Sequence, residues 1–367
     1  MRSDHDQPLL LRVLRAPALS AGLSAVEWDL LLRQADAANL SATLYYLLAG
    51  KGLLEQALPP AREQLEWTHT LALRHQQGVY WEVRLIRRAL QQLGLPIVLL
   101  KGGAYATAEL PPARGRLFTD IDILVPEAAL PQVEAALMLA GWASTHHDAY
   151  DQRYYREWMH ELPPMQHVLR ETLIDVHHAL LPKTAAQHPD SARLLAAALP
   201  IAQAPEFLRL APADMVLHSA THLFADGEFD KGLRDLYDLH QLLSHFGAEP
   251  GFWDGLPERA RALELQRFLF YGLRYARALL GTPVPERVLA AIAPDGPSAP
   301  LRALMDALFL RALLPDHPSC RDALNGLARF CLYVRGNWLR MPPLRLARHL
   351  LHKAFLSPRK KREEKTA

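Results

Sequence analysis

Three aspartates in apolar surroundings have the spacing and residue type that suit metal chemistry. Asp120 and Asp122 stand in Asp-Ile-Asp-Ile-Leu-Val, and Asp175 stands in Leu-Ile-Asp-Val-His. Because side chains alternate along a strand, Asp120 and Asp122 are expected on one face, with Cα atoms about 6.5–7 Å apart. Two such carboxylates repel each other unless a cation neutralises them, and oxygen-only ligands favour Mg²⁺ or Mn²⁺. We therefore predict a metal site, with Asp175 brought beside the pair by a neighbouring strand.

The stretch before these acids is predicted to form a buried strand that ends in a tight turn. Residues 97–100 are apolar and are bounded by Pro96 and by Gly102-Gly103, which is typical punctuation for a central strand. Glycine at Gly102 and Gly103 lets the backbone approach a ligand closely. If a helix begins at Ala104, the N–H groups of both glycines would face a phosphate at its positive end.

Other elements follow from periodicity and from turn residues. Ser24 is a plausible N-cap for a helix over 25–34, and Pro59-Pro60 opens a long helical pattern that ends at Leu93. Residues 166–169 and 173–177 have the spacing of an antiparallel hairpin that carries Asp175. The remaining expected elements are a helix over 130–139, a strand over 142–145, a loop or surface connection over 148–164, and helices from 180 onward.

Length and composition allow a substantial core. The chain has 367 residues, of which 50% are hydrophobic, and a formal net charge of +2 that by itself does not indicate nucleic-acid binding. Two cysteines are too few for a disulfide framework or a zinc site. The N-terminus lacks the apolar region of a signal peptide, and no apolar run approaches the roughly 20 residues that span a bilayer. We expect a cytoplasmic protein without a transmembrane segment.

Taken together, these motifs resemble the nucleotidyltransferase (DNA polymerase β-like) superfamily. More narrowly, they are similar to a poorly characterised bacterial family of uncharacterised nucleotidyltransferases. The motifs that carry the resemblance are Leu99-Leu100-Lys101-Gly102, Arg116 four residues before Asp120, Asp120-Ile-Asp-Ile-Leu-Val125 and Ile174-Asp-Val-His177. The likeness covers residues 80–180 specifically and most of the rest loosely.

The resemblance implies an α+β fold, in which a small mixed-sheet nucleotidyltransferase lobe is framed by helical N- and C-terminal regions. It also implies transfer of a nucleoside monophosphate from an NTP to an acceptor hydroxyl, with release of pyrophosphate. The expected divisions are a helical region over 1–94, a catalytic core over 95–180, a helical region over 181–357 and a basic, disordered tail over 358–367.

The resemblance also assigns roles to individual residues. Asp120 and Asp122 would bridge the metal ions, and Asp175 would complete the site or accept a proton from the attacking hydroxyl. The residues that would bind the nucleotide are Lys101, Gly102, Gly103 and Arg116. The sequence departs from the superfamily pattern because Ala104 replaces a serine-bearing phosphate loop and sixteen residues separate Gly103 from Asp120.

Two motifs further along are candidates for the acceptor side. His218 and His222 stand one helical turn apart, but Ser219 occupies the position where a zinc protease needs its general-base glutamate. Their apolar neighbours favour histidines in the core or lining a cleft, without a metal. Arg234 and Asp235 resemble the family too and could line the acceptor side of the cleft, although ordinary helix ion pairing explains them more readily.

The acceptor and the C-terminal region leave alternatives open. Residues 323–362 contain lysine and arginine but no acid, so a weak contact with RNA, an anionic surface or an acidic partner is one hypothesis. A packed helix followed by a solvated tail is the other. The rival functions are a non-catalytic nucleotide-binding or interaction protein that retains the fold, and a toxin-like enzyme that modifies tRNA.

Overall fold

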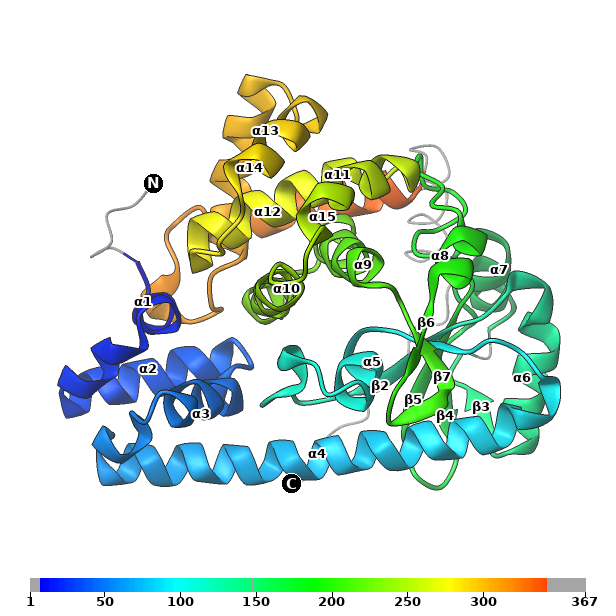
Figure 1. The fold of residues 1–367 in the computed structure, drawn as a ribbon, viewed down its shortest axis with the longest axis horizontal. Helices are drawn as coiled ribbons and strands as arrows, with labels where there is room; N and C mark the ends of the chain where they lie inside the picture. Colours follow the sequence, from blue (N-terminus) through cyan, green and yellow to red (C-terminus); the bar gives the residue numbers. More distant parts are fainter. Residues whose placement is uncertain (1–6, 147, 342–367) are drawn as a thin grey trace.

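The computed structural model describes residues 7–146 and 148–341, which form a mixed seven-stranded sheet flanked by helices (Figure 1). This arrangement confirms the predicted α+β fold. The strands follow the order β3-β4-β5-β2-β1-β7-β6 across the sheet. Their bounds are β1 Val98–Leu99, β2 Asp120–Leu124, β3 Trp142–Ser144, β4 Met165–His167, β5 Leu173–His177, β6 Leu199–Ile201 and β7 Ala204–Arg209.

The centre of the sheet is β2, which pairs antiparallel with β1 and parallel with β5. The predicted hairpin is present, since β4 pairs antiparallel with β5. Strands β6 and β7 come from residues beyond 180 that were expected to be helical, and β7 extends the sheet by pairing parallel with β1. Pro200 and Pro205 obscure these strands in the sequence, because proline cannot donate to a strand ladder and is confined to edges and strand ends.

The helices surround this sheet and extend away from it. Those before residue 140 are α1 Leu9–Arg15, α2 Ala25–Ala37, α3 Ser41–Gly50, α4 Pro59–Leu90, α5 Lys101–Thr107 and α6 Leu130–Leu139. Those after it are α7 Ala149–Trp158, α8 Ser191–Ala197, α9 Pro212–Ala225, α10 Gly232–Phe246, α11 Phe252–Ala262, α12 Gln266–Leu280, α13 Glu286–Ile292, α14 Ala299–Ala312 and α15 Asn325–Arg340. No helix in the described part of the chain has both the length and the apolar composition needed to cross a bilayer.

Local sequence signals explain where several helices begin. Ser24 caps α2 in a reciprocal capping box, in which its backbone N–H donates to Glu27 Oε2 at 2.9 Å. Helix α4 begins at the proline pair and buries a stripe that includes Leu65, Val79 and Ile86. In Figure 1, α4 runs beneath both the N-terminal helices and the sheet, and it packs on α3, α5, α6 and β2.

Two expectations about local structure were wrong. Residues 149–158 form helix α7 where a loop or surface connection was expected, because Tyr150, Tyr154 and Trp158 recur at four-residue spacing and their rings meet edge-on. Helix α5 begins at Lys101, not at Ala104, so both glycines lie inside its first turn. A Cβ at Gly102 would lie 2.9 Å from the ring of Phe118, so glycine is needed for the segment before β2 to pack there.

The basic tail over 358–367 and its contact with an anionic surface lie outside the described residues.

Gly115 lies where the segment that leads into β2 packs closely against helix α3. Its φ of +79° favours glycine, and an added Cβ would lie 2.4 Å from the backbone nitrogen of Thr43. We expect Gly115→Ala to lower the free energy of unfolding by about 2–3 kcal/mol. The control is Gly78→Ala on an open face of α4, where nothing lies within 4 Å and stability should rise by up to about 1 kcal/mol. Urea unfolding measures both, and equal midpoints would contradict the packing role of Gly115.

Candidate functional site

The pairing of β2 with β5 brings the three aspartates together. The two strands are parallel, and their register places Asp122 directly opposite Asp175. Side chains at paired positions lie on the same face of a sheet, and Asp120, two residues before Asp122, shares that face. The predicted neighbouring strand is therefore β5, and it carries Asp175 to the acidic edge of β2.

Asp122 is the buried centre of this group, with only 2% of its surface exposed. Its Oδ1 accepts hydrogen bonds from Lys101 Nζ at 2.8 Å and from His177 Nε2 at 3.0 Å. Burial alone would raise the pKa of Asp122, but the charge of Lys101 and the contact with His177 outweigh burial and hold that pKa well below its usual range. Burial opposes the charge of Lys101 in the same way, yet Asp122 keeps the pKa of Lys101 raised. Asp122 is therefore a carboxylate that two hydrogen-bond donors, Lys101 and His177, already satisfy.

Asp175 has the opposite electrostatic environment. Burial, together with the negative charges of Asp122 and Glu161, raises the pKa of Asp175 to about 7. Asp120 accepts a hydrogen bond from the hydroxyl of Thr119 at 3.0 Å. The atoms that could bind a metal at this edge are carboxylate oxygens. A divalent cation would relieve their mutual repulsion, so their chemistry fits a hard ion such as Mg²⁺.

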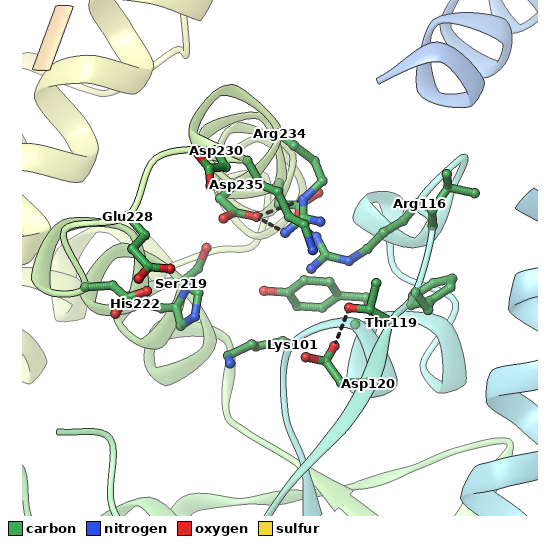
Figure 2. A pocket seen from close by; sticks show the side chains of 17 residues that line it. Lys101, Arg116, Thr119, Asp120, Ser219, His222, Glu228, Asp230, Arg234 and Asp235 are labelled. Carbon is green, nitrogen blue, oxygen red and sulfur yellow. Dashed lines mark hydrogen bonds and ion pairs between the residues drawn. The ribbon is translucent and has the colours of Figure 1, made fainter. Parts of the chain in front are cut away.

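A charged cavity of about 280 Å³ opens between this edge and helices α9 and α10 (Figure 2). We call it the first cavity. Four cationic side chains line it, from α5, from the segment before β2 and from the start of α10: Lys101, Arg116, Lys231 and Arg234. Its acidic side chains are Asp120, Asp226, Glu228, Asp230, Asp235 and Asp238. In Figure 2, Lys101 and Asp120 lie across the cavity from the residues of α9 and α10.

The cations of the first cavity are only partly neutralised. Arg116 forms an ion pair with Asp238, and Arg234 forms one with its neighbour Asp235. Burial, followed by the positive charge of Arg234, nevertheless lowers the pKa of both Arg116 and Lys231. When burial and neighbouring cations disfavour the charged form of a side chain, a bound anion stabilises that charged form. The first cavity therefore offers cationic side chains to a negatively charged ligand, within a lining that also carries six acidic side chains.

Two more cavities adjoin the first at Asp120. The second cavity, of about 340 Å³, lies between β5, α7 and α9 and contains both Asp120 and Asp175. It shares Lys101, Asp120, His222 and Asp226 with the first. The third cavity, of about 420 Å³, is mostly apolar, and it runs from Asp120 along α4 past Trp81. Asp120 thus borders all three spaces, a position that suits a residue which contacts two substrates.

The structure separates the other predicted site residues. Lys101, Gly102, Arg116, Arg234 and Asp235 line the first cavity, whereas Gly103 is buried, and a Cβ there would lie 3.6 Å from Ile121.

His222 lies where the first and second cavities meet. His218, one turn away, is buried, and burial lowers its pKa to about 3. Within the described residues, neither histidine belongs to a group of metal-donor atoms.

Several residues at the site were not predicted from sequence. Lys231 lines the first cavity, and His160, Glu161 and His177 line the second. One signal was available for His177, which stands two residues after Asp175 and so shares its face of β5. The sequence offered no comparable signal for His160 and Glu161, because they follow an aromatic helix whose position depends on tertiary packing.

The raised pKa of Asp175 predicts a stabilising substitution. Its carboxylate is disfavoured in the folded protein, so at pH 8 without metal Asp175→Asn should raise the free energy of unfolding by about 1–3 kcal/mol, since one pKa unit corresponds to about 1.4 kcal/mol. The difference should shrink as pH falls from about 7 toward 4, where the carboxyl becomes protonated in both states. Thermal unfolding at several pH values measures it. A variant less stable than the wild type at pH 8 would contradict the electrostatic account.

Comparisons with known proteins agree with this geometry. A family model described as an uncharacterised nucleotidyltransferase matches residues 24–281, which include the whole sheet and helices α2 to α12. The comparison with curated proteins found no match to this chain. The matched range covers most of the chain and all three aspartates. The chain therefore belongs to the family of uncharacterised nucleotidyltransferases.

Proposed function

We propose that this protein transfers a nucleoside monophosphate from an NTP to a hydroxyl group of an acceptor. The acceptor oxygen bonds to the α-phosphorus while the bond from the α-phosphorus to the oxygen that bridges to the β-phosphate breaks, so pyrophosphate leaves and the hydroxyl proton passes to a base. The observation that carries the proposal is the register of β2 and β5, which sets Asp175 opposite Asp122 beside the first cavity and its four cationic side chains. Membership of the family supports the same class of reaction.

Asp120, Asp122 and Asp175 are the residues that would hold Mg²⁺ or Mn²⁺. When bound, such ions stabilise the negative charge on the attacking and leaving oxygens. Asp122 contributes a charge that Lys101 and His177 keep in place. Asp120 and Asp175 both face the second cavity, where ligands can reach them.

The nucleotide is assigned to the first cavity. Its triphosphate would lie against Lys101, Arg116, Lys231 and Arg234, whose side chains line the space. Gly102 leaves room there for close approach of the phosphates, because a side chain at that position would also fill the space beside Arg116. Arginine offers a planar fork for phosphate oxygens and lysine a point charge. Asp235 holds Arg234 within this wall.

The acceptor is assigned to the second cavity. Its hydroxyl would approach past His222, which borders both cavities, and reach Asp175. Without metal, burial and the neighbouring carboxylates raise the pKa of Asp175 to about 7, and a divalent cation beside it would favour the charged form that accepts a proton. His218 is buried one turn before His222 on α9.

The decisive experiment supplies each NTP labelled at the α-phosphate, with Mg²⁺ or Mn²⁺, to the protein and a cell extract. Label should move into an acceptor fraction, and the same NTP labelled at the γ-phosphate should label only pyrophosphate. Separate RNA, protein and small-molecule fractions identify the class of acceptor and test whether tRNA is modified. NTP binding without transfer to any fraction would favour the non-catalytic alternative.

Asp120 provides the sharpest test of the metal site, because it faces the cavities and has little part in the buried network. We expect Asp120→Asn to reduce transfer by about 100-fold or more, since even indirect partners of metal ligands contribute 10–100-fold. The matched control is Asp29→Asn, an exposed acid on α2 that pairs with Arg33, whose rate should equal that of the wild type. Near-normal turnover by Asp120→Asn would show that the metal assignment is wrong.

Lys231 tests the nucleotide assignment. Loss of one charged contact is worth about 1.5–3 kcal/mol, so Lys231→Gln should weaken Mg²⁺–NTP binding by roughly 10-fold or more. The control is Lys51→Gln, which changes the same charge at an exposed turn that does not line the cavity. Calorimetric titration with NTP measures both affinities. If the two variants bind NTP equally well, the nucleotide does not occupy the first cavity as proposed.

A further inference from the structure

A second group of metal-donor side chains lies beside the aspartates, and none of them is assigned as a ligand of Mg²⁺ in the proposed transfer. One donor atom from each of His160, Glu161 and His177 lies within 4.8 Å of the others. All three residues line the second cavity. We propose that they bind a divalent transition metal of the Zn²⁺ class, at a site separate from the carboxylates that hold Mg²⁺.

Backbone pairing builds this group. Glu161 and His177 form an antiparallel bridge next to the end of β5. The backbone N–H of Leu162 donates to the carbonyl of Val176, and that of His178 donates to the carbonyl of His160, each at 2.9 Å. Opposed residues of an antiparallel bridge place their side chains on one face, a few ångströms apart. The segment after α7 is thus fixed so that Glu161 and His177 face each other.

The hydrogen bond from His177 Nε2 to Asp122 leaves the other ring nitrogen, Nδ1, facing an acceptor. Its Nε2 lies 3.0 Å from Asp122 Oδ1 and donates to that carboxylate. In the neutral ring, Nδ1 then carries a lone pair, and it lies 3.3 Å from Glu161 Oε2, which is also an acceptor. Two acceptors that face each other need a cation or an extra proton between them. A metal on Nδ1 would complete the arrangement in which a metal-bound histidine donates its other N–H to a carboxylate.

His160 supplies the third donor. Its ring centroid lies 5.3 Å from that of His177. Its Nδ1 is buried and has no hydrogen-bond partner within 7–146 and 148–341. A buried polar atom without a partner is costly, and a metal ion would satisfy it. The side chain of Glu161 retains 17% exposure toward the second cavity, which gives an ion a route in.

The three ligand atoms determine which metal ion the site prefers. Two imidazole nitrogens with one carboxylate suit Zn²⁺ and related transition metals, and this combination leaves a position open for a further ligand. Mg²⁺ prefers oxygen ligands and parts with its water reluctantly. The two kinds of ion would therefore occupy neighbouring but chemically distinct sites, linked through His177 and its hydrogen bond to Asp122.

The test measures metal content in the full-length protein, purified without a histidine tag and freed of metal with a chelator. After dialysis against Zn²⁺ and then against excess Mg²⁺, we expect one bound zinc per chain by mass spectrometry. His160→Gln and Glu161→Gln should each weaken zinc binding by about 100-fold in calorimetric titrations. Co²⁺ in place of Zn²⁺ should give visible absorption bands that report its ligand geometry and that each variant abolishes.

The controls separate this site from its surroundings and from the proposed reaction. His222→Gln removes an imidazole that lines the same cavity, and Asp120→Asn removes a ligand assigned to Mg²⁺; both should keep the zinc. If zinc is absent from the wild type, the extra proton on His177 takes the place of the metal and the proposal is wrong. Zinc lost in either control, or retained in both His160→Gln and Glu161→Gln, would also overturn it. None of these outcomes depends on transfer activity.

Discussion

The contact on which this molecule depends is the buried carboxylate of Asp122, shared between Lys101 and His177. It ties together three separate segments: the start of α5, strand β2 and the end of β5. Removing one partner from a buried ionic group costs about 3–5 kcal/mol, because the remaining charge is left uncompensated. Lys101 adopts a φ of +41°, which is unfavourable for a residue with a side chain. The ion pair with Asp122 holds Lys101 in this conformation, at the point where the cavities meet.

Around this centre, the helical part of the chain completes a site that the sheet alone cannot form. Helices α9 and α10 provide one wall of the first cavity, and Asp226 follows the end of α9. Helix α15 approaches this point closely: a Cβ at Gly336 would lie 2.4 Å from the carbonyl oxygen of Asp226, and Gly227 has a φ of +87°. Glycine at both positions lets α15 pack where a larger residue would push the wall outward.

The acidic edge of the sheet brings two kinds of potential metal ligand, oxygen and nitrogen atoms, close together. Asp120 and Asp175 present oxygen atoms, while His160 and His177 present nitrogen atoms beside Glu161. Hydrogen bonding through His177 couples the two groups, since its orientation determines how Asp122 is held. Such coupling means that a change in one group alters the charge and position of the other, even without direct contact between their ligands.

Local sequence determined those features that depend on neighbours within a few residues. The alternation of acid and apolar residues over 120–123 specifies a strand with both acids on one face, and the Ser24–Glu27 capping box specifies the start of α2. The sequence also predicted that a neighbouring strand brings Asp175 beside the pair, but only the tertiary structure decided its parallel direction and the register of Asp122 with Asp175. The tertiary structure likewise decided that β6 and β7 extend the sheet and that Glu161 lies opposite His177. These contacts join residues far apart in the chain, where neither periodicity nor spacing carries information. Lys231 likewise lines the first cavity because α10 packs on α9 and on the turn Pro111–Ala113 that precedes β2, and its own sequence neighbours do not indicate that position.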